Sequence, residues 1–161
     1  MNLNSARIQS PVGIIEISGS EAGIRSILFM DNEIEETPVP AFLQECVTQL
    51  NEYFDGKRKQ FNLKLDPRGT AFQLKVWKKL QEIPFGRTIS YLDLARMTGR
   101  ETNTRAVGNA NGKNQINIVV PCHRVIGSNG KLTGYGGGLW RKEILLKLEM
   151  GDTMPGLFAG T

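Results

Sequence analysis

The sequence predicts an α+β fold in two parts, a small domain of strands and a helix over residues 1–67 and a mainly helical domain over residues 68–161. The first observation is a change of pattern, from short β-rich runs to apolar residues at helical spacing. The second is a change of charge. Residues 1–67 carry 6 Lys and Arg against 10 Asp and Glu, whereas residues 68–161 carry 14 against 6. With 161 residues, 40% of them hydrophobic, the chain is long enough for two small globular domains.

In the first part, two strands are expected before the one helix in the sequence and a third strand after it. The runs VGIIEIS (12–18) and GIRSILFM (23–30) are separated by turn-prone residues and predict a hairpin. The acidic, proline-bearing stretch 31–40 is expected to be a loop. QFNLKL (60–65) alternates as a half-buried strand does. The opening residues 1–13 are polar and irregular and do not resemble a signal peptide.

The helix of the first part is expected to begin after Pro40. Apolar residues then recur at helical spacing. They are Phe42, Cys46, Leu50 and Tyr53 or Phe54. Cys46 is therefore predicted to be a core residue on the apolar face of this helix.

The second part begins with two predicted helices. The first has one apolar stripe and is expected to end at Pro84 and Gly86. The stripe consists of Phe72, Val76, Leu80 and Ile83. In TISYLDLARMTGR, Ser90 is a suitable N-cap for the second helix, Asp93 favours its positive end, and Gly99 ends it.

A third, short helix over Arg105–Asn111 follows a polar turn, with Thr102 or Asn103 as its cap. Helix, turn and short helix in a basic domain are the outline of a helix-turn-helix DNA-binding motif. After Arg105 the side chains are mostly small, so few long donors could reach base edges in a major groove. They suit close approach to a minor groove, with Arg105 as the one long side chain. A close helix–helix contact explains the small residues equally well.

Cys122 and His123 stand side by side after an apolar run, in NIVVPCHRV, and His123 is the only histidine of the chain. A buried cysteine without chemistry is one interpretation. A disulfide with Cys46 is a second, but no signal peptide is recognisable and no apolar run is long enough to span a membrane, so a cytoplasmic, reducing location is expected. A structural zinc site is a third, and two cysteines with one histidine are too few for it.

The stretch from RAVGNANGKN through PCHRV and GYGGGL to LLKLE resembles the active-site region of the O6-alkylguanine-DNA alkyltransferases, and the resemblance runs from about Phe72 to Glu149. It implies a ribonuclease-H-like N-terminal domain in front of a helix-turn-helix, winged-helix-like DNA-binding domain. It also implies DNA repair by direct damage reversal. The alkyl group of O6-alkylguanine would move irreversibly to Cys122, once per molecule, with O4-alkylthymine left open as a second substrate.

The resemblance assigns roles to further residues. His123 would act as the base for Cys122 through a water molecule, and Glu149 would orient the histidine. Asn114 would brace the turn that carries Cys122, and Tyr135 would assist the departure of guanine O6. The guanine pocket would also include Pro121, Val125, Gly136 and Gly137.

The DNA contacts implied by the resemblance lie on the helix-turn-helix. Tyr91 would help to rotate the damaged nucleotide out of the duplex, and Arg105 would fill the gap left behind. The neighbouring contacts would be Ala106, Gly108 and Asn109. The implied partner is double-stranded DNA bound through its minor groove. A monomer without metal, cofactor or membrane partner is expected.

Three other functions use some of the same residues. A cysteine peptidase or acyltransferase would use Cys122 and His123. It needs an oxyanion hole, and it has no need of a basic DNA-binding domain such as residues 68–161. A DNA-binding regulator would leave Cys122, His123 and Glu149 without a role. The alkyltransferase-like proteins, which bind lesions without repairing them, typically carry tryptophan in place of Cys122. The tail 151–161 gives no functional signal.

Overall fold

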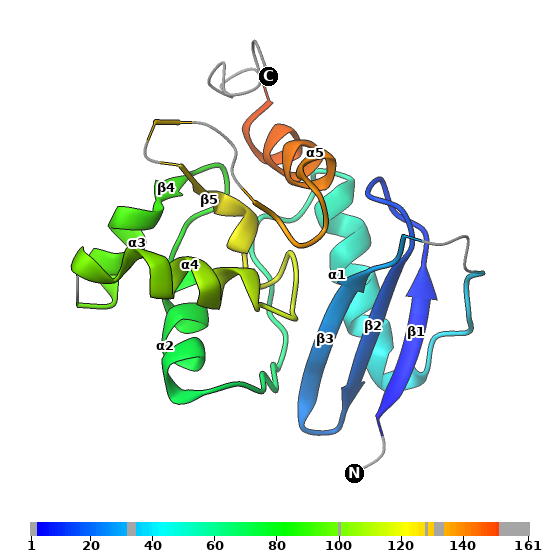
Figure 1. The fold of residues 1–161 in the computed structure, drawn as a ribbon. Helices are drawn as coiled ribbons and strands as arrows, with labels where there is room; N and C mark the ends of the chain where they lie inside the picture. The colour runs from blue at the N-terminus through cyan, green and yellow to red at the C-terminus, as the bar shows by residue number, and fades with distance from the viewer. Residues whose placement is uncertain (1–2, 32–34, 100, 128, 131–133, 152–161) are drawn as a thin grey trace. The chain divides into compact units, whose positions relative to one another are not determined.

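The computed structural model describes residues 3–31, 35–99, 101–127, 129–130 and 134–151. The chain forms two compact units, Met1–Arg68 with Gln115–Asn117 and Gly69–Asn114 with Ile118–Thr161. The first contains a small sheet and a helix, and the second is mainly helical (Figure 1). The predicted α+β fold class is thereby confirmed. Apart from Gly151, the tail lies outside the described residues.

The first unit is built on a three-stranded antiparallel sheet, β1 (Asn4–Ile8), β2 (Ile15–Ser20) and β3 (Gly23–Phe29), in the order β1-β2-β3. The predicted hairpin is therefore present as β2 and β3. Strand β1, which the sequence analysis did not predict, pairs with β2 along its whole length. Its Ala6 and Ile8 are buried at alternate positions, a signal too short to stand out among polar neighbours.

The helix of this unit, α1 (Gln44–Phe54), follows a short 3-10 turn, η1 (Ala41–Leu43), and lies against one face of the sheet (Figure 1). Cys46, Leu50 and Tyr53 are buried, as the spacing predicts. Phe42 was wrongly placed on the buried face: it belongs to the 3-10 turn and is 40% exposed.

The expected strand at 60–65 is not formed, although the exposure of its residues does alternate. One bridge joins Leu65 to Ile24. Upstream, the Gln49 side chain takes the place of a neighbouring strand: its Nε2 donates to the Asn62 carbonyl at 3.0 Å, and its Oε1 accepts from the Asn62 amide at 2.9 Å. The backbone polar groups of Asn62 are satisfied by a side chain, so no ladder is needed.

The second unit begins with α2 (Ala71–Leu80), which Thr70 and Gln73 cap reciprocally. The helix ends at Leu80, earlier than the end predicted from Pro84 and Gly86. Ile83, the last residue of the predicted apolar stripe, therefore lies in the following turn, where it is still buried. Trp77, which the predicted stripe omits, is buried and donates from Nε1 to the Ala110 carbonyl at 2.8 Å.

Two short helices then form the expected helix-turn-helix, α3 (Tyr91–Met97) and α4 (Thr104–Gly112), joined through the turn η2 (Glu101–Asn103). Ser90 is the N-cap of α3, as predicted, and Asp93, expected only as a favourable charge, also accepts from the Ser90 amide and completes a capping box. Asn103 occupies the N-cap position of α4, although its side chain makes no capping hydrogen bond. α4 packs on both α2 and α3.

The remaining elements bring together the residues of the PCHRV and LLKLE motifs. A turn η3 (Cys122–Arg124) leads into β5 (Val125–Ile126), which pairs in parallel with β4 (Ile89–Ser90). The last helix, α5 (Leu139–Met150), packs against η3. Among the helices that the structure describes, none is long and apolar enough to cross a membrane.

Candidate active site

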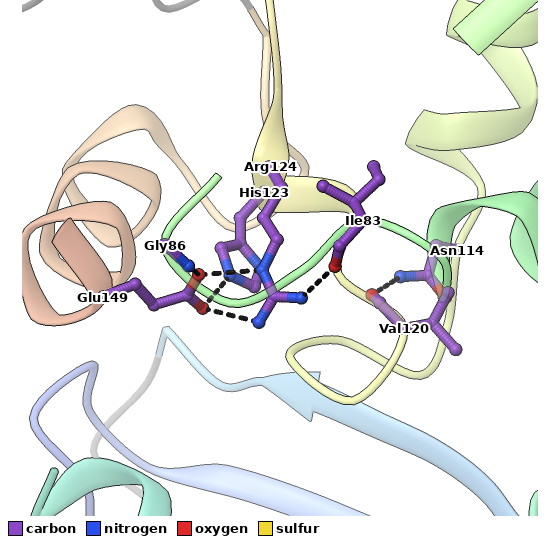
Figure 2. Close-up of polar contacts among 7 residues, drawn as sticks. All are labelled: Ile83, Gly86, Asn114, Val120, His123, Arg124 and Glu149. Atoms are coloured by element: carbon purple, nitrogen blue, oxygen red, sulfur yellow. Dashed lines mark hydrogen bonds and ion pairs between the residues drawn. The ribbon is translucent and has the colours of Figure 1, made fainter. Parts of the chain in front are cut away.

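Cys122 begins the tight turn η3 and is only 4% exposed. Asn114 braces this turn, because its Nδ2 donates to the Val120 carbonyl at 2.8 Å and lies 3.2 Å from the Cys122 sulfur (Figure 2 shows the first of these contacts). Ile118, between them, has a φ of 73°. A β-branched residue in that region is strained, and such strain persists only where the surroundings impose it. The turn therefore fixes Cys122 in one position.

The surroundings of Cys122 act on its ionisation in opposite directions. Burial raises the pKa of the thiol. Hydrogen bonds from Asn114 and Tyr135, and the positive charge of Lys142, work against that increase. Because burial dominates, the resting group is a thiol, and a nucleophilic sulfur requires that a base remove its proton.

His123 is fully buried and paired with Glu149, with 2.6 Å between Nε2 and Oε2 (Figure 2). Burial lowers the pKa of the imidazole, although the Glu149 carboxylate acts in the other direction. In the neutral ring, Nε2 must carry the hydrogen, because an ionised carboxylate only accepts. Nδ1 is then an acceptor, and it has no hydrogen-bond partner among the described residues. The histidine is thus held in the tautomer that can take up a proton at Nδ1.

Glu149 is held from several sides (Figure 2). Arg124 donates to it from Nε at 2.8 Å and from Nη2 at 3.1 Å, and the Gly86 amide donates at 3.3 Å. Burial by itself would raise the pKa of this carboxyl, but the charges of and hydrogen bonds from His123 and Arg124 outweigh it and hold the pKa well below its usual range. Glu149 is therefore ionised at neutral pH.

Arg124 is the residue of this cluster that sequence analysis missed. It is 6% exposed, and its Nη1 donates to the Ile83 carbonyl at 2.6 Å (Figure 2). The guanidinium thus connects Glu149 on α5 with the turn after α2. A signal was present, because an arginine next to the site histidine in PCHRV has to find a carboxylate if it is buried.

The residues expected to form the guanine pocket lie on both sides of Cys122. Pro121, just before η3, and Val125, the first residue of β5, are both buried. Tyr135 is half-buried and hydrogen-bonds to Cys122. Gly136 is exposed, and Gly137 accepts a hydrogen bond at 2.9 Å from Arg141, the third residue of α5. The glycine run is therefore attached to the helix that carries Glu149.

The expected DNA-contacting residues lie on the helix-turn-helix, and their exposure differs. Arg105 and Asn109 are exposed on α4, and Ala106 is half-buried. A Cβ on Gly108 would lie 3.7 Å from the Tyr91 ring, an ordinary van der Waals distance, so Gly108 is on the side of α4 that faces α3. Ala110, by contrast, is buried. The burial of Ala110 and the contact of Gly108 with Tyr91 agree with a close helix–helix contact, and the minor-groove interpretation stays a prediction.

Two family models match the chain over most of its length. The model of the DNA binding domain of 6-O-methylguanine DNA methyltransferase matches residues 71–151, and that of its ribonuclease-like domain matches residues 5–67. The chain belongs to the 6-O-methylguanine DNA methyltransferase family. Within the described residues, no three His, Cys, Asp or Glu side chains are grouped so that they could hold a metal ion.

Relatives and solved structures of this family agree along nearly the whole chain. The methylated-DNA–protein-cysteine methyltransferases of Methanosarcina barkeri and Mycobacterium bovis are 48% and 47% identical; each alignment covers 88% of this chain, and 94% and 89% of those proteins. The crystal structure of Mycobacterium tuberculosis O6-methylguanine methyltransferase has a TM-score of 0.84 at 45% identity, covering 92% of this chain and 93% of that one. Mycobacterium tuberculosis OGT in complex with DNA has a TM-score of 0.83 at 45% identity, covering 94% and 95%.

Proposed function

We propose that this member of the methyltransferase family repairs O6-alkylguanine in DNA by direct reversal, moving the alkyl group to Cys122 in a single irreversible turnover. The observation that carries the proposal is the arrangement around Cys122. The buried thiol of Cys122 lies in a turn that Asn114 braces. The next residue is His123, whose Nε2 is hydrogen-bonded to Glu149, so that its Nδ1 can accept a proton.

The transfer uses the neutral His123 as its base. The proton leaves the Cys122 sulfur and reaches Nδ1 of His123 through a water molecule, and the Glu149 carboxylate stabilises the imidazolium that forms. The thiolate attacks the alkyl carbon, so an S–C bond forms as the C–O6 bond breaks. The electron pair of that bond stays on guanine. Guanine takes up one proton and the imidazolium of His123 releases one, so guanine returns to its normal form and His123 becomes neutral again.

Arg124 and Tyr135 support this chemistry from two sides. Arg124 keeps Glu149 ionised and in position throughout the proton transfer. Tyr135, which hydrogen-bonds to Cys122, is near enough to the reacting atoms to donate to guanine O6 as charge develops there. The pocket residues Pro121, Val125, Gly136 and Gly137 would hold the base between them.

DNA would be bound through α4, in the minor groove. This helix exposes a long cation, Arg105, and the short Asn109, next to the small, half-buried Ala106 and Gly108. An alkyl carbon on a stacked guanine cannot be reached in line by a protein sulfur, so the nucleotide has to rotate out of the duplex. Tyr91 would assist the rotation, and Arg105 would occupy the gap.

The division of labour follows the chain. We propose that residues 1–67 form the ribonuclease-like domain and residues 68–161 the domain that binds DNA and transfers the alkyl group. The protein would act as a cytoplasmic monomer. Positive charge is concentrated in the second part, as binding to a polyanion requires.

Intact-mass measurement after mixing with duplex DNA that contains O6-methylguanine tests the proposal. We expect one added methyl group per chain, located on Cys122 by peptide mapping, with no further turnover at excess substrate. Continued product formation, or methylation of Cys46, would contradict it. Binding of the lesion without any mass change would instead favour a DNA-binding regulator, and thiol release from an acyl substrate would favour an acyltransferase.

A further inference from the structure

Two neighbouring side chains at the start of α5 show an unusual distribution of burial. Trp140 is 50% exposed, whereas Arg141, the next residue, is 3% exposed. The reverse is usual, because arginines are mostly exposed and tryptophans are mostly buried. The two side chains are in contact, since Cζ of Arg141 lies over the Trp140 ring, 4.5 Å from its centroid. None of the steps proposed above uses either residue.

Arg141 is attached to the glycine run that precedes α5. Its Nη1 donates to the Gly137 carbonyl at 2.9 Å, and its backbone amide donates to the Gly138 carbonyl at 3.2 Å. Both glycines belong to a tight turn over 135–138, which is closed by a hydrogen bond from the Gly138 amide to the Tyr135 carbonyl at 2.9 Å. One arginine therefore contacts the last two residues of the turn that begins with Tyr135.

The Trp140 indole packs on the same turn. Gly138 has a φ of 91°, in the region that favours glycine. A Cβ on Gly138 would lie 3.1 Å from Cδ1 and 3.2 Å from Nε1 of the indole, closer than ordinary packing allows. The indole therefore lies directly against the Gly138 backbone while its ring lies on the guanidinium of Arg141.

This contact explains why the arginine is buried and the tryptophan is not. The indole covers the guanidinium and shields it from water. The attraction between a guanidinium and an aromatic face is stronger when the cation is desolvated, and the planar guanidinium can stack on the ring and donate hydrogen bonds at the same time. The hydrogen bond from Arg141 to the Gly137 carbonyl is thus made under a cover of indole.

The turn over 135–138 needs such support because three of its four residues are glycines. Glycine loses more conformational freedom on folding than any other residue, so an unsupported run of three would populate many conformations. The same turn carries Tyr135 and the proposed pocket residues Gly136 and Gly137. Its conformation therefore decides whether the pocket is formed.

We propose that Trp140 and Arg141 are positioning residues, which together hold the turn over 135–138 in the conformation that receives the alkylated guanine. They act through the turn and do not touch the reacting atoms. When the binding-competent conformation is only partly populated, the apparent dissociation constant rises as that population falls. Loss of the stacked pair should therefore weaken substrate binding but hardly change the rate of transfer from the bound complex. The inference rests on the function proposed above for its substrate, whereas the order of the turn can be measured without any substrate.

The first test measures transfer from free O6-benzylguanine to the full chain at increasing concentrations, which separates the half-saturating concentration from the maximum rate. We expect Trp140→Leu to raise the half-saturating concentration about fivefold and to leave the maximum rate within about twofold. Trp140→Phe keeps an aromatic face and should recover most of the affinity. Leu139→Ala is the matched control, because Leu139 is about as exposed as Trp140, and it should change neither quantity.

The second test follows hydrogen–deuterium exchange of the Gly138 amide by NMR without substrate, because this amide closes the turn. Exchange should be about fivefold faster in Trp140→Leu than in the parent, and unchanged in Leu139→Ala. Arg141→Lys cannot stack as a plane and should also speed the exchange. The double variant should be no worse than Arg141→Lys alone, since both side chains act through one turn. If Arg141→Lys does not fold, the variants of the half-exposed Trp140 decide the matter.

Three results would overturn the proposal. They are unchanged Gly138 exchange in Trp140→Leu, equal effects of Leu139→Ala and Trp140→Leu, and a lower maximum rate at an unchanged half-saturating concentration. If Gly138 exchange changes as expected but not even the parent accepts a benzyl group, the proposed function fails, and the role of Trp140 and Arg141 in ordering the turn stands.

Discussion

Cys46 and Cys122 are both buried, 1% and 4% exposed, yet their surroundings differ in kind. Cys46 lies on the apolar face of α1, where burial raises its pKa to about 12. Burial also raises the pKa of Cys122, but there Asn114, Lys142 and Tyr135 oppose the increase, and a fixed histidine follows in the chain. Burial alone makes a thiol inert. Burial among preorganised donors, a cation and a base makes it a controlled nucleophile.

Removal of the thiol from each place should give the largest difference. Cys122→Ala is expected to abolish alkyl transfer, because no other group lies in position to accept the alkyl carbon. Cys46→Ala should still take up one methyl group per chain. Intact mass after incubation with O6-methylguanine DNA measures both. Residual transfer in Cys122→Ala would mean that the two cysteines are interchangeable.

Removal of the Glu149 charge next to His123 should lower the reactivity of Cys122 without abolishing it. Glu149→Gln keeps the size of the side chain but cannot stabilise an imidazolium, so transfer should slow by about a hundredfold, within the range of general-base effects. Affinity for undamaged duplex DNA, measured by fluorescence anisotropy, should hardly change. Equal losses of transfer and affinity would show that Glu149 only supports the fold.

The change Arg105→Ala tests access to the thiol rather than its chemistry. Transfer from duplex DNA should fall by tens of fold. Extrusion of the nucleotide costs a few kcal/mol, and without Arg105 no side chain fills the gap that the nucleotide leaves in the duplex. Transfer from free O6-benzylguanine needs no extrusion and should be nearly normal. Arg105→Lys should restore only part of the duplex activity, since lysine lacks the planar guanidinium. Comparable losses on both substrates would assign Arg105 to the fold.

The carboxylate network around Cys122 predicts a pH dependence of stability that the apolar site of Cys46 lacks. The pKa of Glu149 is lower in the folded protein than in the unfolded chain, so its contribution is fully present above the unfolded value of about 4.3 and is lost as the pH falls below it. The free energy of unfolding of the parent should therefore decrease more steeply than that of Glu149→Gln between pH 6 and 3. Urea unfolding measures both, and parallel curves would contradict the network.

The smallest effect is expected at Cys46 itself. Cys46→Ala leaves a small cavity against the sheet and should cost about 1–2 kcal/mol of unfolding free energy, on the scale of other buried truncations. The rate of alkyl transfer should stay within about twofold. Thermal unfolding and a single-turnover assay check the two parts, and a large loss of rate would connect Cys46 to the reaction.

Local patterns were enough to predict much of the fold. The N-cap position of Ser90 and the buried face of α1 depend on residues a few positions apart, and both are present. Elements that depend on distant partners were harder. β1 exists because β2 lies beside it, and the strand at 60–65 fails because Gln49, on α1, takes the hydrogen bonds of Asn62.

The sequence by itself determined the chemistry on offer: one histidine beside one cysteine, a motif order that points to a family, and a basic second half. Only the tertiary structure decided which side chains act on each other. It brought Arg124 and His123 to Glu149, 25 and 26 residues further on. The physical reason is that hydrogen bonds and buried charges act over a few ångströms in space. Two residues far apart in the chain have no local pattern that records such a contact.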